Sequence, residues 1–460
     1  MKPGDGEARK RAIEALVLAA ETGAFVDEVL PSRFAGLDPR DRRLLHEVVY
    51  GVSRHVNTLD TLINFHLKLP VSRQKPAVAW ALRAGAYQLV YLTRVPAHAA
   101  VNQTVEALKS LPGADSKAPG FVNAVLHKVS KDIRRKSAEE PVDRDDPTVI
   151  PIRDGFCHIN RPVLELIRLD RTAHFSIKYS QPAWLVARWL ERFGEEETRR
   201  LCEAQNRTPA VTARVTAAAP SRDAAIESLK ADGIEAAPGS LADSLVLAEA
   251  AGLEASSTLA KGWIQIQDET AIRIGAVLNP PAGARVLDLC AAPGGKAIQL
   301  LERIGPGGRL TAADRTEEKL ALLRENLSRT GAQFTTELVP EDPAELALPE
   351  RFTHVLVDAP CSNTGVLARR PEARWRVKRD DIGTLAQLQA KLLDAAFRHL
   401  EPGGRLVYAT CSIEPEENEN AVAQAFARHS GLIESDTKLF LPHRTGGDGG
   451  YYSLILRPRG

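Results

Sequence analysis

The chain has 460 residues, which is too long for a single hydrophobic core of ordinary size, so two or three domains are expected. Its composition, 44% hydrophobic and 26% charged, is typical of a soluble globular protein, and no run of about 18 apolar residues predicts a membrane span. The opening residues, Met-Lys-Pro-Gly-Asp-Gly-Glu, predict no secretory signal, and the five scattered cysteines predict no disulfide framework, so we expect a reducing, cytoplasmic location.

The formal net charge of +1 conceals an asymmetry along the chain. Residues 1–136 contain 21 Lys and Arg against 13 Asp and Glu, a net charge of +8, so the remaining residues carry −7. Apolar residues recur at helical spacing from residue 8 to residue 131, and Asp38-Pro39 is a typical helix start. The sequence therefore predicts an all-α domain over 1–136. Its charge favours a polyanion such as RNA as partner, although a solvated helical surface would give the same count.

The next part of the chain shows weaker periodicity. A charged, proline-containing stretch, Arg-Arg-Lys-Ser-Ala-Glu-Glu-Pro-Val-Asp-Arg-Asp-Asp-Pro, predicts a linker over 137–176, with one helix around 163–169. Residues 177–260 are expected to form a small α+β subdomain. Its predicted elements are a helix over 183–193, a strand over 210–215, a helix over 222–231, and strands over 234–237 and 245–248.

From residue 261 onward, strand and helix patterns alternate. The predicted strands cover 285–290, 309–313, 335–339, 353–358, 404–410 and 452–456, and the predicted helices cover 296–303, 316–329, 382–399 and 418–429. This alternation is typical of a parallel, doubly wound α/β sheet of the Rossmann-like kind, which we expect over 261–460.

A glycine-rich turn follows the first strand of this last domain, in Leu-Asp-Leu-Cys-Ala-Ala-Pro-Gly-Gly-Lys at 287–296. It lacks G-x-G-x-x-G spacing, which disfavours a dinucleotide, and a purely structural turn is the alternative. Asp314 lies twenty residues after Gly294, at a strand end where an acid accepts hydrogen bonds from ribose hydroxyls. S-adenosylmethionine, a sulfonium cation without a pyrophosphate, suits nearby carboxylates. The candidates are Asp288, Asp314, Asp342 and Asp358.

Two cysteines follow later strands of the same predicted sheet, Cys361 in Asp-Ala-Pro-Cys-Ser and Cys411 in Ala-Thr-Cys-Ser. Ligands bind at the carboxyl ends of such strands, so both thiols are expected in the crevice of the glycine turn. A thiolate that adds to C6 of cytosine makes C5 able to attack a methyl sulfonium, and a second thiol can assist release. Asp358 is placed to hydrogen-bond N3 and N4 of the base. Two buried cysteines packing as small hydrophobes are the alternative.

A basic segment directly follows the first cysteine. It holds six cationic side chains around one tryptophan, which fits phosphate contacts and a base-stacking platform, although a solvated basic loop would have the same composition. The candidate RNA-binding residues are Arg369, Arg370, Arg374, Trp375, Arg376 and Lys378.

At these motifs the chain resembles a known family, the bacterial rRNA 5-methylcytosine methyltransferases of NOL1/NOP2/Sun type, and within it the Sun/Fmu branch. Its distinctive segments are Gly262-Trp-Ile-Gln-Ile-Gln-Asp-Glu, Cys290-Ala-Ala-Pro-Gly-Gly-Lys296, Asp358-Ala-Pro-Cys361-Ser and Thr410-Cys411-Ser-Ile-Glu-Pro-Glu-Glu-Asn-Glu. Upstream, Val95-Pro-Ala-His-Ala-Ala-Val-Asn-Gln-Thr-Val-Glu106 resembles the NusB-like helical domain of that branch, and Asn206-Arg-Thr-Pro-Ala-Val-Thr resembles its small RNA-recognition-like subdomain.

The resemblance implies roles for individual residues. Cys411 is expected to be the nucleophile, with Cys361 assisting product release; in DNA cytosine methyltransferases the Pro-Cys cysteine attacks instead, which makes Cys361 the rival nucleophile. The implied cofactor-binding residues are Cys290, Ala291, Ala292, Pro293, Gly294, Gly295, Lys296, Asp314, Asp342 and Asp358. The chain departs from the family at Glu341-Asp342, at Asn363, where glycine is commoner, and in the tail Asp448-Gly-Gly-Tyr-Tyr.

The implied activity is S-adenosylmethionine-dependent methylation of a cytosine C5 in 16S rRNA, at position 967 in standard rRNA numbering. We expect a monomer that needs neither a metal nor a membrane. The alternatives are the same chemistry on another rRNA or tRNA cytosine, and a non-catalytic NusB-like RNA-binding factor.

Overall fold

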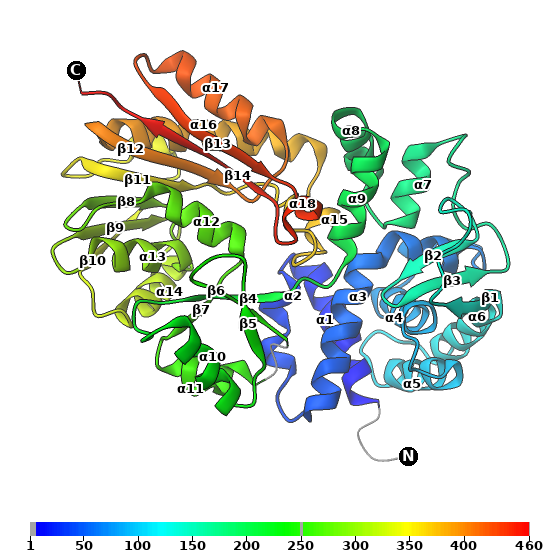
Figure 1. Cartoon of the computed structure of the whole chain (residues 1–460). Helices are drawn as coiled ribbons and strands as arrows, with labels where there is room; N and C mark the ends of the chain where they lie inside the picture. The colour runs from blue at the N-terminus through cyan, green and yellow to red at the C-terminus, as the bar shows by residue number, and fades with distance from the viewer. Residues whose placement is uncertain (1–5, 249–251, 460) are drawn as a thin grey trace. The chain divides into compact units, whose positions relative to one another are not determined.

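A computed structural model of the chain describes residues 6–248 and 252–459 (Figure 1). No helix within these ranges is long and apolar enough to cross a bilayer. The chain divides into two compact units. The first comprises Met1–Arg207 with Arg370–Arg376, and the second comprises Thr208–Arg369 with Val377–Gly460. The chain therefore passes from the first unit to the second and returns briefly to the first before completing the second.

The first unit begins with the predicted helices. They are α1 (Glu7–Thr22), α2 (Val26–Val29), α3 (Pro39–Asn64), α4 (Pro76–Tyr91), α5 (Ala97–Lys109) and α6 (Ala118–Asp132). The Asp38 side chain accepts a hydrogen bond from Asp41 N (2.8 Å), and Pro39 occupies the first turn of α3, as the sequence predicted. The core of the bundle includes nearly every residue of α4, which is buried on all sides.

The predicted linker is wrong: residues 133–164 fold onto the helical core. They form an antiparallel sheet of order β1-β3-β2, with strands β1 (Ile133–Ser137), β2 (Val149–Ile152) and β3 (Gly155–Ile159). Ile150, Cys157 and Leu164 belong to the same buried cluster as the helices, and no helix forms around 163–169. Strands of four or five residues give too short a pattern to stand out beside a charged, proline-containing connection.

The first unit also contains three helices of the region predicted as a small subdomain and its approach. These are α7 (Arg171–Lys178), α8 (Ala183–Phe193) and α9 (Glu195–Asn206). The short helix α15 (Ala373–Arg376) belongs to the first unit as well, although it follows the first cysteine motif in sequence. The predicted 177–260 subdomain is therefore split after α9: its first part belongs to the first compact unit and the rest to the second.

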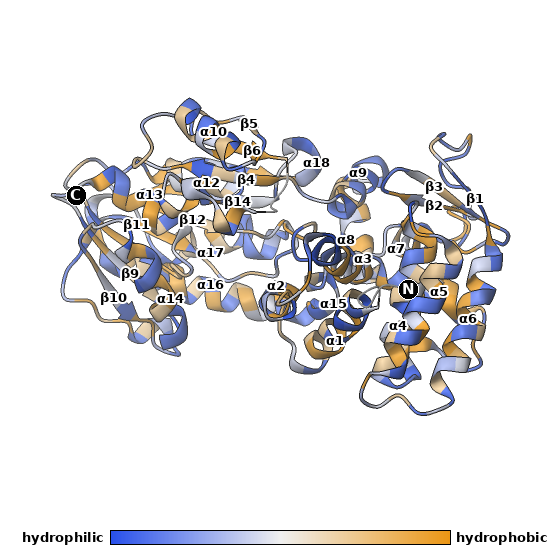
Figure 2. Cartoon of the chain, turned by 90° about the horizontal axis from the view of Figure 1, so that it is seen from below, coloured by the Kyte–Doolittle hydropathy of each residue, from blue (hydrophilic) through white to orange (hydrophobic). Residues whose placement is uncertain are grey.

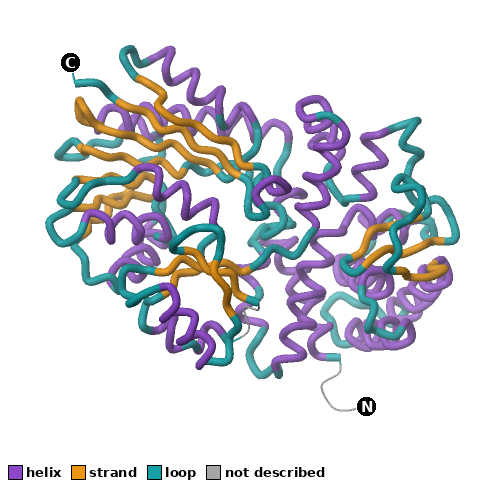
Figure 3. The backbone as a smooth tube through the Cα atoms, viewed as in Figure 1, coloured by secondary structure: helices purple, strands orange, loops and turns teal. Residues whose placement is uncertain are grey.

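The second unit begins with a four-stranded antiparallel sheet of order β5-β6-β4-β7. Its strands are β4 (Val211–Val215), β5 (Ala236–Pro238), β6 (Ser244–Leu247) and β7 (Ile264–Ile266), and its helices are α10 (Arg222–Ala231) and α11 (Ser257–Ala260). This small sheet and the larger sheet of the same unit are both drawn in orange in Figure 3.

The larger sheet has seven strands in the order β10-β9-β8-β11-β12-β14-β13. Its strands are β8 (Arg285–Leu289), β9 (Arg309–Asp314), β10 (Phe334–Leu338), β11 (Phe352–Asp358), β12 (Leu400–Thr410), β13 (Ile433–Phe440) and β14 (Gly450–Leu456). The first five strands in this order are parallel, but β14 runs antiparallel to both β12 and β13. The sheet is therefore mixed, which corrects the expectation of a wholly parallel one.

Helices cover both faces of this sheet, as in a doubly wound fold. They are α12 (Glu269–Leu278), α13 (Gly295–Ile304), α14 (Glu317–Ser328), α16 (Arg379–His399), α17 (Glu419–Arg428) and the short α18 (Pro442–Thr445). Val355 and Val357 of β11 pack in one cluster with α16 and α17, whereas Leu356 packs in a second cluster with α12, α13 and α14. The helices mix polar and apolar residues along their length (Figure 2), as expected when only one face is buried.

Several elements of this domain were not predicted, among them β13 and α12. β13 is a polar edge strand with Ile433–Lys438 exposed, so its sequence lacks the alternation of apolar and polar residues that marks a half-buried strand. α12 is capped by Asp268, whose side chain accepts from Thr270 N (2.8 Å), and it begins where the motif at 262–269, noted only for its resemblance, ends.

Candidate active site

Two neighbouring parallel strands bring both cysteine motifs to one edge of the large sheet. β11 ends at Asp358 and β12 at Thr410, and Asp358 is paired in register with Ala409. The turns that follow these strands consequently lie side by side. Cys361 Sγ and Cys411 Sγ are 2.8 Å apart, and both cysteines are free. Long-range strand pairing thus joins two thiols that are fifty residues apart in the sequence.

The two thiols differ in their surroundings. The hydrogen bond with the Cys411 thiol, followed by burial, raises the pKa of Cys361 well above its ordinary value. Cys411 Sγ also lies 3.2 Å from Asn363 Oδ1, and Asn363 Nδ2 donates to Cys361 O (3.0 Å). Asn363 has φ +62°, a conformation that asparagine tolerates better than most residues. The residue that departs from the family pattern therefore contacts both cysteines.

A partly buried ion pair lies at the same sheet edge as the thiols. Lys296 Nζ is 2.6 Å from Asp358 Oδ2, which links the first turn of α13 to the end of β11. Burial disfavours the charged ammonium, but attraction to Asp358 outweighs it, so the pKa of Lys296 is raised. Lys296 therefore supplies a positive charge at the sheet edge.

The glycine turn between β8 and α13 has the conformation that its residues predict. Gly294 has φ +112° and begins α13, and a Cβ at this position would come within 3.1 Å of the Leu323 side chain. Asn326 Nδ2 donates to Pro293 O (2.8 Å), which holds the turn against α14. The turn leaves backbone close to the edge where the parallel strands end.

Two acids of the candidate set flank this turn. Asp314, at the end of β9, accepts from Ala292 N (3.0 Å) and Arg315 N (2.7 Å) and pairs with Lys319 (3.1 Å). Asp288 is 1% exposed, and neither of its carboxylate oxygens has a hydrogen-bond partner within residues 6–248 and 252–459. Burial, and then the charge of Asp358, raises the pKa of Asp288 well above its ordinary value. A buried acid without partners is where a polar or cationic ligand group would be accommodated.

Asp342 has a different environment from the other candidate acids. Its side chain accepts from Ala344 N (3.0 Å) and pairs with Lys391 Nζ (3.2 Å), and the side chain is 42% exposed. The structure assigns it the role of a cap for the short helical turn Pro343–Glu345 after β10. These contacts account for Asp342 without a ligand.

The basic segment is largely engaged within the protein. Arg374 is fully buried and donates to Arg54 O, Ser180 O, Asn206 Oδ1 and Gln205 O, all within the first unit. The prediction that Arg374 contacts RNA phosphate is wrong, because its guanidinium is enclosed and both of its terminal nitrogens already donate to these acceptors.

Other members of the segment are also held by contacts. Trp375 Nε1 donates to Ser53 O (2.9 Å), Arg376 donates to the Gly23 and Ala24 carbonyls, and Arg370 pairs with Asp27 (3.4 Å). Arg369 pairs with Asp268 and Asp448 in the second unit. Lys378 is exposed. The composition of the segment reflects buried hydrogen bonding as much as a charged surface.

The structure also identifies a functional candidate that the sequence reasoning did not single out. Glu417, in the short helical turn Pro415–Glu417, is fully buried and accepts hydrogen bonds from the serines that follow both cysteines. The available signal was the Cys-Ser dipeptide present in both motifs, but the shared acceptor is visible only after folding.

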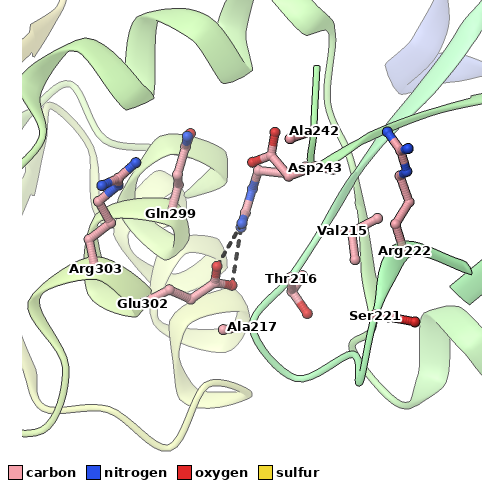
Figure 4. Close-up of a pocket in the computed structure, with 11 residues that line it drawn as sticks. Val215, Thr216, Ala217, Ser221, Arg222, Ala242, Asp243, Gln299, Glu302 and Arg303 are labelled. Atoms are coloured by element: carbon pink, nitrogen blue, oxygen red, sulfur yellow. Dashed lines mark hydrogen bonds and ion pairs between the residues drawn. The ribbon is translucent and has the colours of Figure 1, made fainter. Parts of the chain in front are cut away.

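A separate cavity of about 320 Å³ lies between the small sheet and α13 in the second unit (Figure 4). Arg214 and Glu302 form a two-pronged ion pair there, with distances of 2.6 and 3.1 Å, and Arg222, Asp243 and Arg303 also line the cavity. None of the cysteine or glycine-turn residues lines it. It is therefore distinct from the candidate active site.

Three family models match successive parts of the chain. Residues 6–131 match the NusB family, residues 181–254 match the ferredoxin-like domain of the RsmF/B-like methyltransferases, and residues 275–455 match the 16S rRNA methyltransferase RsmB/F family. These matches agree with the predicted order of NusB-like, small α+β and Rossmann-like methyltransferase domains.

Whole proteins are also similar over nearly the full length. Ribosomal RNA small subunit methyltransferase B of Klebsiella pneumoniae is 33% identical over 462 residues, which cover 98% of each chain. In fold, the chain resembles the crystal structure of PH0851 (TM-score 0.79, 24% identity, 98% of each chain). It also resembles NSun6 from Pyrococcus horikoshii with SFG (TM-score 0.55, 19% identity, covering 61% of this chain and 99% of that one).

The cofactor is S-adenosylmethionine, the methyl donor expected of the matched methyltransferase family. The residues of this chain fit it, because the buried Asp288 carboxylate, directly before the glycine turn, has no hydrogen-bond partner among the described residues. Since 33% identity extends over 98% of both sequences, the chain belongs to the ribosomal RNA small subunit methyltransferase B family.

Proposed function

We propose that the chain methylates C5 of a cytosine in 16S rRNA, at position 967, through a covalent bond between Cys411 and C6. The observation that carries the proposal is the pair of sulfurs 2.8 Å apart at the sheet edge that also bears the glycine turn. The matching family is described as acting on 16S rRNA, and the whole-length relative is named for the small subunit. The position follows from the resemblance of the sequence motifs.

In the first half of the proposed reaction, Cys411 acts as a thiolate. Its sulfur bonds to C6 of cytosine, and the electron pair of the C5=C6 bond moves to C5, which becomes nucleophilic. When bound, S-adenosylmethionine supplies the electrophilic methyl group that C5 takes. Asp358 accepts a hydrogen bond from the N4 amino group, and Lys296 Nζ, 2.6 Å from Asp358 Oδ2, holds that carboxylate in place.

In the second half, Cys361 acts as a base. After losing its own proton to water, its thiolate accepts the proton from C5. The C5–H electron pair restores the C5=C6 bond, the Cys411–C6 bond breaks, and Cys411 returns as a thiolate.

The roles of the two cysteines are separated by single substitutions. Cys411→Ala should abolish methyl transfer to 16S rRNA and form no adduct, because the attacking sulfur is gone. Cys361→Ala should accumulate a covalent protein–RNA adduct, because addition and transfer proceed but release stalls. Methyl incorporation is followed with labelled cofactor, the adduct as a shifted band on a denaturing gel, and the methylated position by bisulfite sequencing.

Cys202→Ala is the matched control, since Cys202 is a buried cysteine of the first unit and should affect neither readout. Cofactor affinity should remain within a few-fold in all three variants. An adduct in Cys411→Ala, with none in Cys361→Ala, would reverse the two roles. Methylation at a cytosine other than 967 would retain the chemistry and change the target.

A further inference from the structure

The buried carboxylate of Glu417 joins the two cysteine motifs from behind. Glu417 Oε2 accepts from Ser362 Oγ and from Ser412 Oγ, each at 2.5 Å. Glu417 Oε1 accepts from Ser362 N (2.9 Å) and from Gln389 Nε2 (3.1 Å). Glu417 and Ser412 are fully buried, and Ser362 is 4% exposed. One buried carboxylate therefore accepts from four donors.

The donors belong to the turns that carry the thiols. Ser362 follows Cys361 and Ser412 follows Cys411, and the two seryl oxygens lie 3.1 Å apart. Gln389 Nε2 also donates to Pro360 O (2.9 Å), the carbonyl immediately before Cys361. The same carboxylate therefore fixes the backbone position of both cysteines.

Glu417 is itself anchored to β12, the strand that ends at Thr410, immediately before Cys411. Tyr408 Oη donates to Glu417 O (2.6 Å). The next residue, Asn418, accepts from Thr410 Oγ1 (2.6 Å) and donates through Nδ2 to Ser412 O (3.0 Å). Because both sides of the carboxylate are tied to β12, the acceptor has little freedom to move relative to the thiols.

A buried carboxylate is costly unless it is fully hydrogen-bonded. Burial raises the pKa of Glu417, against the hydrogen bonds of Ser362 and Ser412, which favour the ionised form. A core position that needed only packing would be served by an apolar residue. The arrangement is explained if geometry at the two sulfurs requires it, since a misplacement of about 1 Å at a reacting group can cost about a hundredfold in rate.

We propose that Glu417 is a positioning residue. Through Ser362 and Ser412 it holds Cys361 and Cys411 side by side, so that both sulfurs can act on the same cytosine ring. The proposal rests on the proposed cysteine chemistry for its functional meaning. The positioning role itself, in which the relative position of the two thiols depends on the Glu417 carboxylate, does not depend on which nucleotide is methylated.

The test uses the full-length chain with Ser362→Ala, Ser412→Ala and Glu417→Gln. The matched control is Ser453→Ala, which removes a hydrogen bond from another buried serine to a carboxylate, Ser453 Oγ to Oε1 of the exposed Glu434 (2.6 Å), in the same sheet. The readouts are kcat and KM for RNA and cofactor, thermal stability, and the pH profile of iodoacetamide alkylation at Cys361 and Cys411, resolved by peptide mass spectrometry.

Each of the two serine variants should lower kcat about tenfold or more with KM for the cofactor unchanged, and should shift the alkylation profiles. Ser453→Ala should lower stability but leave kcat and alkylation unchanged. The double variant Ser412→Ala with Glu417→Gln should lose less than the sum of its parts, since both changes break one network.

Equal losses of stability in Ser362→Ala, Ser412→Ala and Ser453→Ala, with wild-type kcat and alkylation profiles, would overturn the proposal. Altered alkylation in a chain that methylates no cytosine would instead uphold the positioning and reject the proposed function. The two failures are therefore distinguishable.

Discussion

At the scale of residues, the charges around Arg369 make the folding stability of the protein depend on pH. Arg369 donates to Asp448 Oδ2 and to Asp268 Oδ2, both at 2.7 Å, so one guanidinium serves two buried carboxylates. Burial, and then the charge of Asp268, raises the pKa of Asp448 to about 7, although Arg369 opposes the shift. The next residue, Gly449, donates its N–H to Gly365 O (2.8 Å), close behind the first cysteine motif. The protonation of Asp448 therefore occurs beside the active-site turns.

Asp448 should weaken folding as the pH rises. Its ordinary pKa is about 3.9, so between pH ~4 and ~7 the folded chain keeps a proton that the unfolded chain has lost. Folding then takes up a proton, and the free energy of unfolding falls by up to about 1.4 kcal/mol per pH unit in this window. Relative to Asp448→Asn, the wild type should lose stability from pH 5 to pH 7 in urea titrations.

Asp223→Asn provides the comparison for loss of an exposed carboxylate. A difference between wild type and Asp448→Asn that is constant from pH 5 to pH 7 would show that Arg369 keeps Asp448 ionised throughout.

At the scale of elements, the short helix α15 shows how a basic segment can serve the interior. Arg374 places its guanidinium among main-chain carbonyls of other elements: Arg54 directly before the kink at His55 in α3, Ser180 after α7, and Gln205 near the end of α9. These carbonyls need donors once they are buried, and a planar guanidinium supplies several in fixed directions. Arg374 thus acts as a shared cap that fixes α15 in the first unit.

Replacing Arg374 by Met should destabilise the first unit by about 3 kcal/mol, because several buried carbonyls would lose their donor together. Arg379→Met, at an exposed position nearby, should change stability by no more than about 0.5 kcal/mol. Chemical denaturation followed by hydrogen exchange in α7 and α9 would measure the effect where it arises. Equal stability of the two variants would contradict the capping role.

At the scale of the whole molecule, the first unit is larger than the basic helical segment of the sequence. Deleting residues 1–136 would remove β1, which pairs with β3, and would expose the core that Ile150 and Cys157 share with the helices. A test of RNA binding by this unit therefore needs surface substitutions. Lys128 and Lys131 of α6 and Arg134 and Arg135 of β1 are all exposed.

We expect these four side chains to contribute phosphate contacts, as the +8 charge of residues 1–136 suggests. Changing all four to Gln should weaken binding to a 16S rRNA hairpin and flatten its salt dependence by about 0.7 to 0.9 per lost contact. Cofactor binding should be unaffected, because the glycine turn lies in the second unit. The measurement is a titration at several salt concentrations.

Lys230→Gln with Lys261→Gln removes two exposed charges from the second unit and controls for net charge alone. Salt slopes that match the wild type in the fourfold variant would exclude this surface from RNA contact and point to a protein partner.

The sequence by itself determined the helices of residues 8–131, most strands of the large sheet, and the edge at which the glycine turn and both cysteines emerge. These features depend on local periodicity and on chain order, since strand–helix alternation predicts which ends of the strands meet. The resemblance to the family implied which thiol attacks and which assists release, and the fold places Cys361 and Cys411 in contact.

Only the tertiary structure decided what depends on partners distant in sequence. The strands β1 to β3 and the antiparallel β13 and β14 are set by pairing, which a local pattern does not record. The burial of Arg374 is decided by carbonyls more than 160 residues away in the chain, and the shared acceptor of Ser362 and Ser412 is visible only when Glu417 is folded behind them. The sequence does not record whether a charged side chain is solvated or buried, because folding decides whether water or protein surrounds it.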